Sequence, residues 1–191
     1  PSAGQANATG GGNPALTPEK AKTYSFGTVL QPSFVPGLTL TVDYYNIVVN
    51  TAITSATPGD ILGDCFGTNP AAITTAQAAS VACTSIRRSS SNGRLSGSPA
   101  AIAGLPQPVT NRGRLATDGI DFALNYKNDL GFADLSLSFV GNYTMKSEFR
   151  ASPTSYNRDC VGYFSANCGS IQPKYQWNQR TTLSFDNIDV S

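Results

Sequence analysis

The charged side chains of one long stretch are all arginines. Between Asp64 and Asp118 the chain contains no acidic residue and no lysine, although its overall net charge is only +1. The arginines of this basic stretch are Arg87, Arg88, Arg94, Arg112 and Arg114. A guanidinium group offers a planar set of donors that matches a carboxylate or a phosphate. We expect the stretch to bind an anionic ligand or lipid phosphates, and the alternative is an ordinary solvated loop.

A second stretch combines aromatic and basic residues. Tyr156, Tyr163 and Phe164 lie close in sequence to Arg150 and Arg158. Aromatic rings of this kind can stack on a sugar or on an aromatic ligand, and they can equally pack around a nearby disulfide. We therefore predict a second ligand-binding region here, with packing as the alternative interpretation.

Catalytic chemistry has little support in the composition. The chain contains no histidine, which excludes histidine-dependent triads, HExxH zinc sites and imidazole acid–base catalysis. Asp118 and Asp121 are close in sequence, but an odd spacing on one strand puts two side chains on opposite faces, which does not suit a glycosidase pair. We expect no enzyme activity, no metal site and no cofactor.

The four cysteines fall in two segments rich in small and turn-forming residues. Cys65 and Cys83 share the first segment, and Cys160 and Cys168 share the second. Four cysteines allow three connectivities, and strand-like sequence separates the two pairs, so we predict the local disulfides Cys65–Cys83 and Cys160–Cys168. No CxxC motif supports a metal site. Disulfides indicate an oxidising compartment.

The elements that would position these residues are long amphipathic strands. Apolar and polar residues alternate in five segments: 23–30, 38–46, 120–127, 134–145 and 174–185. Strict alternation predicts strands with one apolar and one polar face. Short turns are expected at 31–37 and 128–132, and long loops at 51–116 and 147–173. Inside the first loop, 58–64 and 72–82 are expected to form short helices.

Short turns at one end of the strands and long, disulfide-bearing loops at the other are typical of an outer-membrane β-barrel. Strands of ten or more residues are long enough to cross a bilayer. The uncharged stretch Cys65–Ile86 is too polar for a transmembrane helix, and the first residues do not resemble a signal peptide. A soluble β-sandwich is the alternative, although its strands are usually only about five or six residues long.

Several segments resemble TonB-dependent outer-membrane receptors, in the same order as in that family. The first is Gly12–Gly27, which resembles an "NP-x-L-x-PE … G" entry into a barrel strand. The others are Pro36–Ile47, Thr117–Phe122, Pro173–Asn178 and the surroundings of Cys65 and Cys160. Together they cover nearly the whole chain.

The resemblance implies a fold and a function. The fold is all-β, part of a large antiparallel transmembrane barrel that has 22 strands when complete. We expect residues 1–191 to be a fragment of this barrel domain, with the plug domain, the TonB box and the barrel C-terminus absent. The function is binding of a scarce nutrient, a siderophore, cobalamin or a glycan, and its import with energy transduced by TonB.

The same resemblance implies partners and a location. The partners are the TonB complex, through the absent N-terminal part, outer-membrane lipid and lipopolysaccharide, and a small-molecule or oligosaccharide ligand, with no nucleic acid. The location is the bacterial outer membrane, with the long loops extracellular. Two other functions stay open: a non-transporting surface barrel or adhesin whose loops bind partners, and a secreted β-sandwich that serves as a binding module.

Overall fold

The structure is a computed structural model that describes residues 6–67, 70–96, 103–165, 167–169 and 171–191. The helices are α1 (Pro58–Phe66), η1 (Pro70–Ala72, a 3-10 turn), α2 (Thr75–Ala78) and α3 (Val81–Thr84). The strands are β1 (Ala8–Gly11), β2 (Lys20–Leu30), β3 (Leu38–Ser55), β4 (Leu105–Asp129), β5 (Asp134–Arg150), β6 (Arg158–Asp159), β7 (Tyr175–Phe185) and β8 (Ile188–Val190). The fold is therefore all-β, as the alternating pattern predicted.

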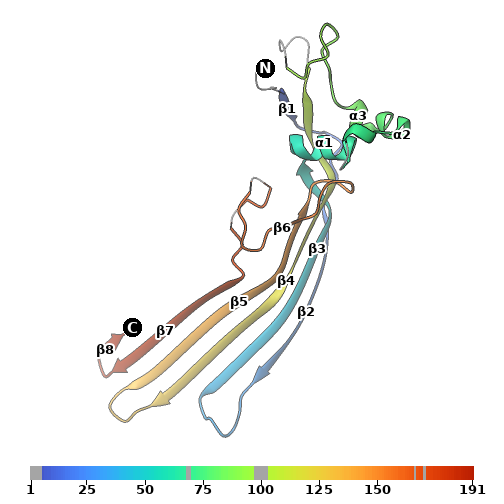
Figure 1. Cartoon of the computed structure of the whole chain (residues 1–191). Helices are drawn as coiled ribbons and strands as arrows, with labels where there is room; N and C mark the ends of the chain where they lie inside the picture. Colours follow the sequence, from blue (N-terminus) through green and yellow to red (C-terminus); the bar gives the residue numbers. More distant parts are fainter. Residues whose placement is uncertain (1–5, 68–69, 97–102, 166, 170) are drawn as a thin grey trace. The chain divides into compact units, whose positions relative to one another are not determined.

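The strands form one eight-stranded sheet with a simple order. The path is β2-β3-β4-β5-β7-β8, and β1 and β6 pair with β4 and β5 beside it. Strands that follow one another along this path lie side by side (Figure 1). β7 is antiparallel to both β5 and β8. This single sheet contradicts the β-sandwich alternative, which requires two sheets packed face to face.

The five predicted strands are confirmed as β2, β3, β4, β5 and β7, but the predicted loop boundaries are wrong. β3 continues to Ser55 and β4 begins at Leu105, so the first long connection is shorter than 51–116. β5 likewise continues to Arg150, inside the predicted loop 147–173. The two short turns are found where the sequence indicated them, between β2 and β3 and between β4 and β5.

The start of β4 contains two prolines, and it lies within the segment predicted to be a loop. Proline cannot donate to a β-ladder, so Pro106 and Pro108 argued against a strand. In the structure both prolines lie in the parallel ladder with β1, whose register joins Thr9 to Pro106 and Gly11 to Pro108. The amide of Leu105 donates to the carbonyl of Asn7 at 2.8 Å. The parallel β1 ladder thus accommodates a strand whose local sequence is unfavourable.

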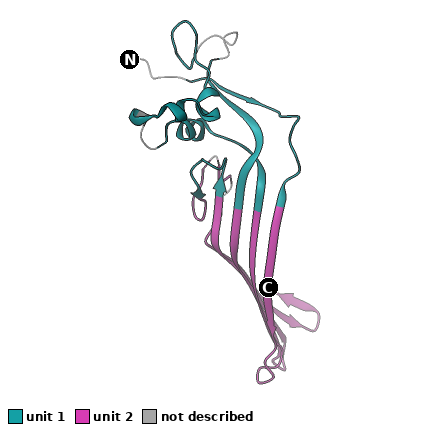
Figure 2. Cartoon of the chain, turned by 90° about the vertical axis from the view of Figure 1, so that its right-hand side faces the viewer, with its two compact units in different colours: residues 1–20, 49–115, 149–158 teal, residues 21–48, 116–148, 159–191 magenta. Residues whose placement is uncertain are grey.

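The chain divides into two compact units, which Figure 2 colours separately. Unit 1 comprises residues 1–20, 49–115 and 149–158, and unit 2 comprises residues 21–48, 116–148 and 159–191. β3, β4 and β5 contribute to both units. Unit 1 contains the helices, the N-terminal strand and the basic stretch, and unit 2 contains most of the regular sheet.

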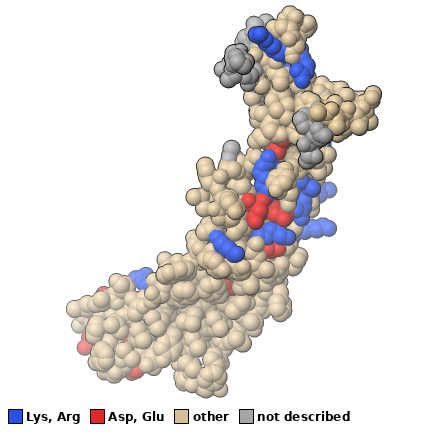
Figure 3. Space-filling model, viewed as in Figure 1, with Lys and Arg blue, Asp and Glu red and all other residues tan. Residues whose placement is uncertain are grey.

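One face of the sheet in unit 2 carries a row of stacked aromatic rings. Phe122 stacks on Phe139 with ring centroids 5.5 Å apart, and Phe139 stacks on Trp177 at 5.9 Å. Gly141 lies beneath the Phe122 ring, in a place where a Cβ atom would come within 2.3 Å of the ring. Trp177 nevertheless remains 66% exposed, because no second layer of the described residues covers it. Figure 3 shows few charged side chains over β2 to β5 near their hairpin turns.

The opposite face of unit 2 is polar and cross-linked by hydrogen bonds. The Asn142 amide donates to Asp121 at 2.7 Å and to the hydroxyl of Tyr45 at 3.1 Å. Gly119 makes room for the Tyr45 ring, since a Cβ atom there would lie 2.6 Å from the hydroxyl oxygen. The sheet therefore has the two unlike faces that the alternating pattern predicted.

Candidate ligand-binding loops

Helix α1 is specified at both ends by its own sequence. Thr57 is the N-cap and forms a capping box with Asp60, and Pro58 occupies the first turn, where its missing amide costs nothing. The helix stops at Gly67, whose φ of 62° suits glycine, and the Gly67 amide donates to the Gly63 carbonyl. The prediction of a helix over 58–64 is confirmed.

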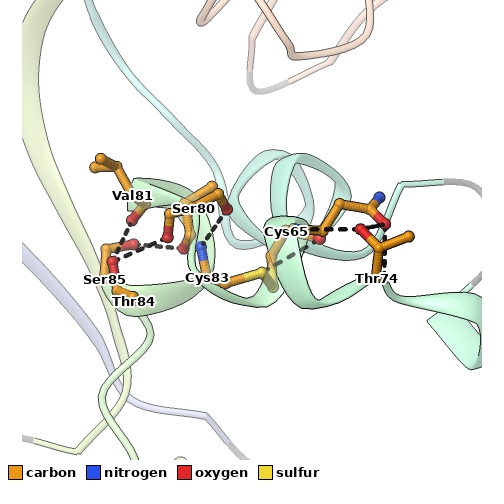
Figure 4. Close-up of a disulfide and its surroundings, with 9 residues drawn as sticks. Cys65, Thr74, Ser80, Val81, Cys83, Thr84 and Ser85 are labelled. Atoms are coloured by element: carbon orange, nitrogen blue, oxygen red, sulfur yellow. Dashed lines mark hydrogen bonds between the residues drawn. A yellow bond between two sulfur atoms is a disulfide. The ribbon is translucent and has the colours of Figure 1, made fainter.

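The predicted helix over 72–82 is instead two separate single turns. Thr74 caps α2 in a capping box with Gln77, and Ser80 caps α3 by accepting from the amide of Cys83. Each cap accepts from a backbone amide that has no partner at the start of a helix. A new helix therefore begins after Ser80, and α2 does not continue through it. Figure 4 shows α3 joined to α1 by the Cys65–Cys83 disulfide.

Both predicted disulfides are present. Cys65 pairs with Cys83 in unit 1, and Cys160 pairs with Cys168 in unit 2. Cys65 and Cys160 are buried, and no described cysteine is free. The first disulfide holds α1 and α3 together as one support for the loop residues around them.

Residues 151–158 dock against the acidic face of α1. Arg158 donates to the carboxylate of Asp60 at 2.6 Å, and the Asp60 side chain is only 1% exposed. Burial alone would raise the pKa of Asp60, but hydrogen bonds from Arg158 and Thr57 outweigh it and lower the pKa below its ordinary value. Asp60 is therefore charged at neutral pH, and it links helix α1 to the first part of the connection between β5 and β7.

Asp64 makes the second link, one helical turn after Asp60. Its carboxylate accepts from the hydroxyl of Ser152 at 2.8 Å and lies 3.5 Å from that of Ser155. The two serine hydroxyls are themselves 2.7 Å apart. Positions i and i+4 share one face of a helix, so Asp60 and Asp64 together hold the segment 151–158. We call this arrangement the α1 clamp. The signal for this clamp in the sequence is the pair of acids four residues apart in a predicted helix.

A cavity of about 250 Å³ lies beside the α1 clamp within unit 1. Its walls come from α1, from α3 and the residue after it, from the first residues of β4 and from the segment 151–152. The lining residues are Ala56, Ile61, Asp64, Val81, Ala82, Ser85, Pro106, Pro108, Thr110, Arg112, Ala151 and Ser152. Most of these side chains are apolar, and the basic one is Arg112.

The structure separates the five arginines of the basic stretch into two groups. Arg87, Arg88 and Arg94 are exposed in the connection before β4, where the Arg88 guanidinium donates to the Gly93 carbonyl at 3.2 Å. Arg112 and Arg114 lie two residues apart on β4. Arg112 lines the cavity and Arg87, Arg88 and Arg94 do not. Binding of an anion by any of the five stays a prediction.

The aromatic residues of the second predicted region are strongly exposed. Tyr156 belongs to unit 1 and is 78% exposed, whereas Tyr163 and Phe164 lie inside the Cys160–Cys168 loop of unit 2 and are 67% and 74% exposed. Rings packed around a disulfide would be covered, so their exposure argues against the packing interpretation. Ligand binding by these three residues stays a prediction.

The N-terminal segment, which carries part of the family resemblance, is anchored in unit 1 by its polar side chains. The amide of Asn13 donates to the Val109 carbonyl at 3.2 Å. Thr17 and Asn111 exchange two hydrogen bonds of 2.7 Å each. These contacts attach the segment before β2 along β4, so the "NP-x-L-x-PE" residues have a structural role.

Two further searches among the described residues are negative. No group of three or more cysteine, aspartate and glutamate side chains could hold a metal ion. No helix in this part of the chain is long and apolar enough to cross a membrane.

Comparison with known proteins places the chain in a family. A search of the curated proteins and a search of the solved structures find no match. A family model does match, and it covers residues 1–187 of the 191 in the chain. Its description is "TonB dependent receptor-like, beta-barrel", which agrees with the resemblance seen in the sequence and with the single two-faced sheet. The chain therefore belongs to the TonB-dependent receptor-like β-barrel family of the bacterial outer membrane.

Proposed function

We propose that this chain forms part of the 22-stranded barrel of an active transporter in the outer membrane. The transporter binds a scarce nutrient, a siderophore, cobalamin or a glycan, and imports it with energy transduced by TonB. The observation that carries the proposal is the family match, because it extends over residues 1–187 and leaves almost none of the chain for another function.

The sheet of unit 2 supports a membrane setting for the proposal. Its aromatic face is exposed in the described residues, and lipid is the natural cover for a face of this kind. β2 and β8 are the edges of the sheet, and an open edge in lipid leaves backbone groups unpaired at a cost of several kcal/mol each. In the proposed barrel both edges pair with further strands.

The loops support the proposed orientation. Disulfides persist in oxidising surroundings, and unit 1 and the Cys160–Cys168 loop contain both of them. We place these loops on the extracellular side, facing ligand and lipopolysaccharide, and the short turns in the periplasm. The plug domain and the TonB box, which would contact the TonB complex, belong to parts of the transporter outside this sequence.

Growth of a deletion strain tests the function. A strain that lacks the whole gene is grown with iron, cobalamin or an oligosaccharide as the limiting nutrient, with and without a plasmid that restores the full-length protein. We expect restoration to rescue growth on one nutrient and to fail when TonB is also deleted. Equal growth of all strains on every nutrient would contradict import. Rescue of growth in the absence of TonB would indicate a passive pore. A deletion strain that grows normally but attaches poorly to surfaces would indicate an adhesin.

A further inference from the structure

The unit 1 cavity has an apolar body. Pro106 and Pro108 line it from β4, and Ile61, Val81 and Ala82 line it from helices α1 and α3. None of the described residues that line it is aromatic. Protein sites for sugars generally combine a ring for stacking with several hydrogen-bonding groups, so these walls are a poor match for a glycan.

The polar groups in the walls are mostly occupied already. Asp64 and Ser152 bind each other in the α1 clamp, and the Ser85 hydroxyl donates to the Ala82 carbonyl at 2.7 Å. A ligand with many hydroxyl groups would leave those groups unpaired on entering, and each unpaired buried polar group costs about 1–3 kcal/mol.

Arg112 is the charged lining residue that the α1 clamp does not use, and its side chain is partly open to solvent. It reaches the cavity from β4, on the same strand face as Pro106 and Pro108, because residues two apart in a strand share a face. Among the residues that the structure describes, none forms an ion pair or a hydrogen bond with its guanidinium group. The Asp64 carboxylate also lines the cavity, but it already accepts from Ser152 and Ser155. The single guanidinium that remains matches one carboxylate, whereas a phosphate dianion calls for more cationic groups than the cavity offers.

We propose that this cavity binds a small carboxylate with an apolar body, the carboxylate paired with Arg112 and the hydrocarbon part against the apolar walls. The volume of about 250 Å³ is below the usual range of about 300–1,000 Å³ for drug-sized ligands, so we expect a ligand smaller than a drug-sized molecule. This inference rests on the proposed function, since it names the class of molecule that the transporter's loops take up.

Hexanoate is the probe for this site, and 1-hexanol is its uncharged counterpart. Binding of each to the full-length protein in lipid nanodiscs is measured by saturation-transfer difference NMR, with empty nanodiscs subtracted as background. We expect hexanoate to bind at least about tenfold more tightly than hexanol, because a charge-assisted hydrogen bond adds about 1.5–3 kcal/mol. Equal binding of the two, or no binding of either, overturns the proposal.

Three variants separate the carboxylate contact from nonspecific effects. Arg112→Gln should weaken hexanoate about tenfold and leave hexanol unchanged. Arg94→Gln, which removes an exposed arginine of the same stretch outside the cavity, should change neither. Ala82→Leu should weaken both ligands by filling space. An equal loss of hexanoate binding in the Arg94 and Arg112 variants overturns the proposed site. If Arg112→Gln does not fold, Arg112→Lys is used in its place.

The import assay distinguishes the two possible failures. If growth rescue depends on TonB but hexanoate does not bind, the carboxylate inference is wrong and the transport function stands. If hexanoate binds and Arg112→Gln weakens its binding about tenfold, the site is present even in a protein that imports nothing.

Discussion

The two units of this chain obtain their order from different sources. Unit 1 buries residues of its own, among them Leu105, which is 1% exposed, and Asp60, which is 3% exposed as a whole residue. It also contains the Cys65–Cys83 disulfide. Unit 2 is a sheet whose large apolar side chains stay outside, with Phe26 at 79% and Trp177 at 66% exposure. Unit 1 is therefore stabilised by internal packing and hydrogen bonds. Unit 2 relies on its β-ladders and on an apolar environment around one face.

The difference teaches how to interpret a change in either unit. A polar substitution in unit 1 acts on a defined contact, so its effect is local. A polar substitution on the aromatic face of unit 2 acts on the transfer of that face into lipid, so its effect depends on which face of the strand it occupies. The same charged substitution at two neighbouring positions of one strand should therefore cost very different amounts of stability.

The largest effect is expected from a charge on the apolar face of β5. Leu137 lies opposite Thr181 in the ladder, on the face with Phe139, and Ser136 lies opposite Thr182 on the other face. Leu137→Arg should destabilise the folded, membrane-inserted protein by about 2–4 kcal/mol. Ser136→Arg is the matched control, and it should cost less than about 1 kcal/mol because a charge on the polar face is hydrated.

The measurement is the guanidinium-dependent folding of the full-length protein into phospholipid vesicles. Losses of equal size at positions 136 and 137 would contradict the assignment of the two faces. A larger loss at 136 would mean that the faces are reversed with respect to lipid.

The sheet could be predicted from the sequence because its signal is local. Strict alternation gave the five strands of the path β2-β3-β4-β5-β7, and turn-forming residues gave the two short connections. The disulfides were also predictable, since each pair lies within one loop. The start of β4 was not, because Pro106 and Pro108 oppose a strand locally and only pairing with β1 allows one.

The candidate site was less predictable, because its contacts join distant parts of the chain. Arg158 and Asp60 are separated by 98 positions, and no local pattern indicates that two such distant residues meet. The basic stretch was recognised as one group of arginines, whereas the structure brings Arg112 alone to the cavity. Composition can show an excess of charge, but it cannot show which of the charged side chains lines a cavity.

A smaller and local effect is expected in unit 1 from Asp60→Asn. Asparagine can still accept from Thr57 and keep the helix cap, so the change isolates the ion pair with Arg158. Removing one member of a buried pair costs about 3–5 kcal/mol, and partial exposure of Arg158 reduces our expectation to about 2 kcal/mol. Hydrogen exchange in peptides covering 151–158 should then accelerate about 30-fold.

The control for this variant is Asp129→Asn, which changes an acid that binds only the turn amide of Gly131 in unit 2. It should leave exchange in 151–158 unchanged. Unchanged exchange in the Asp60 variant would mean that the α1 clamp does not hold the segment, and equal acceleration across the sheet of unit 2 would mean that the two units do not respond separately.

The smallest effect is expected when acid protonates Asp60 and weakens its ion pair with Arg158. Because the pKa of Asp60 is lowered by folding, its contribution to stability is complete above the ordinary pKa of about 3.9 and is lost as the pH falls through the folded value. At pH 3, about one unit below the ordinary value, exchange in 151–158 should accelerate by no more than about tenfold after correction for the intrinsic rate.

Acid also changes exchange through effects that do not involve Asp60, so the informative quantity is the difference between the natural protein and Asp60→Asn. Protonated aspartate and asparagine are both neutral, and the gap in exchange between the two proteins should therefore narrow from pH 6 to pH 3. A constant gap would show that the variant acts through shape and not through charge. A gap that narrows in 151–158 but not in the strands of unit 2 would show that the stabilising charge belongs to unit 1 alone.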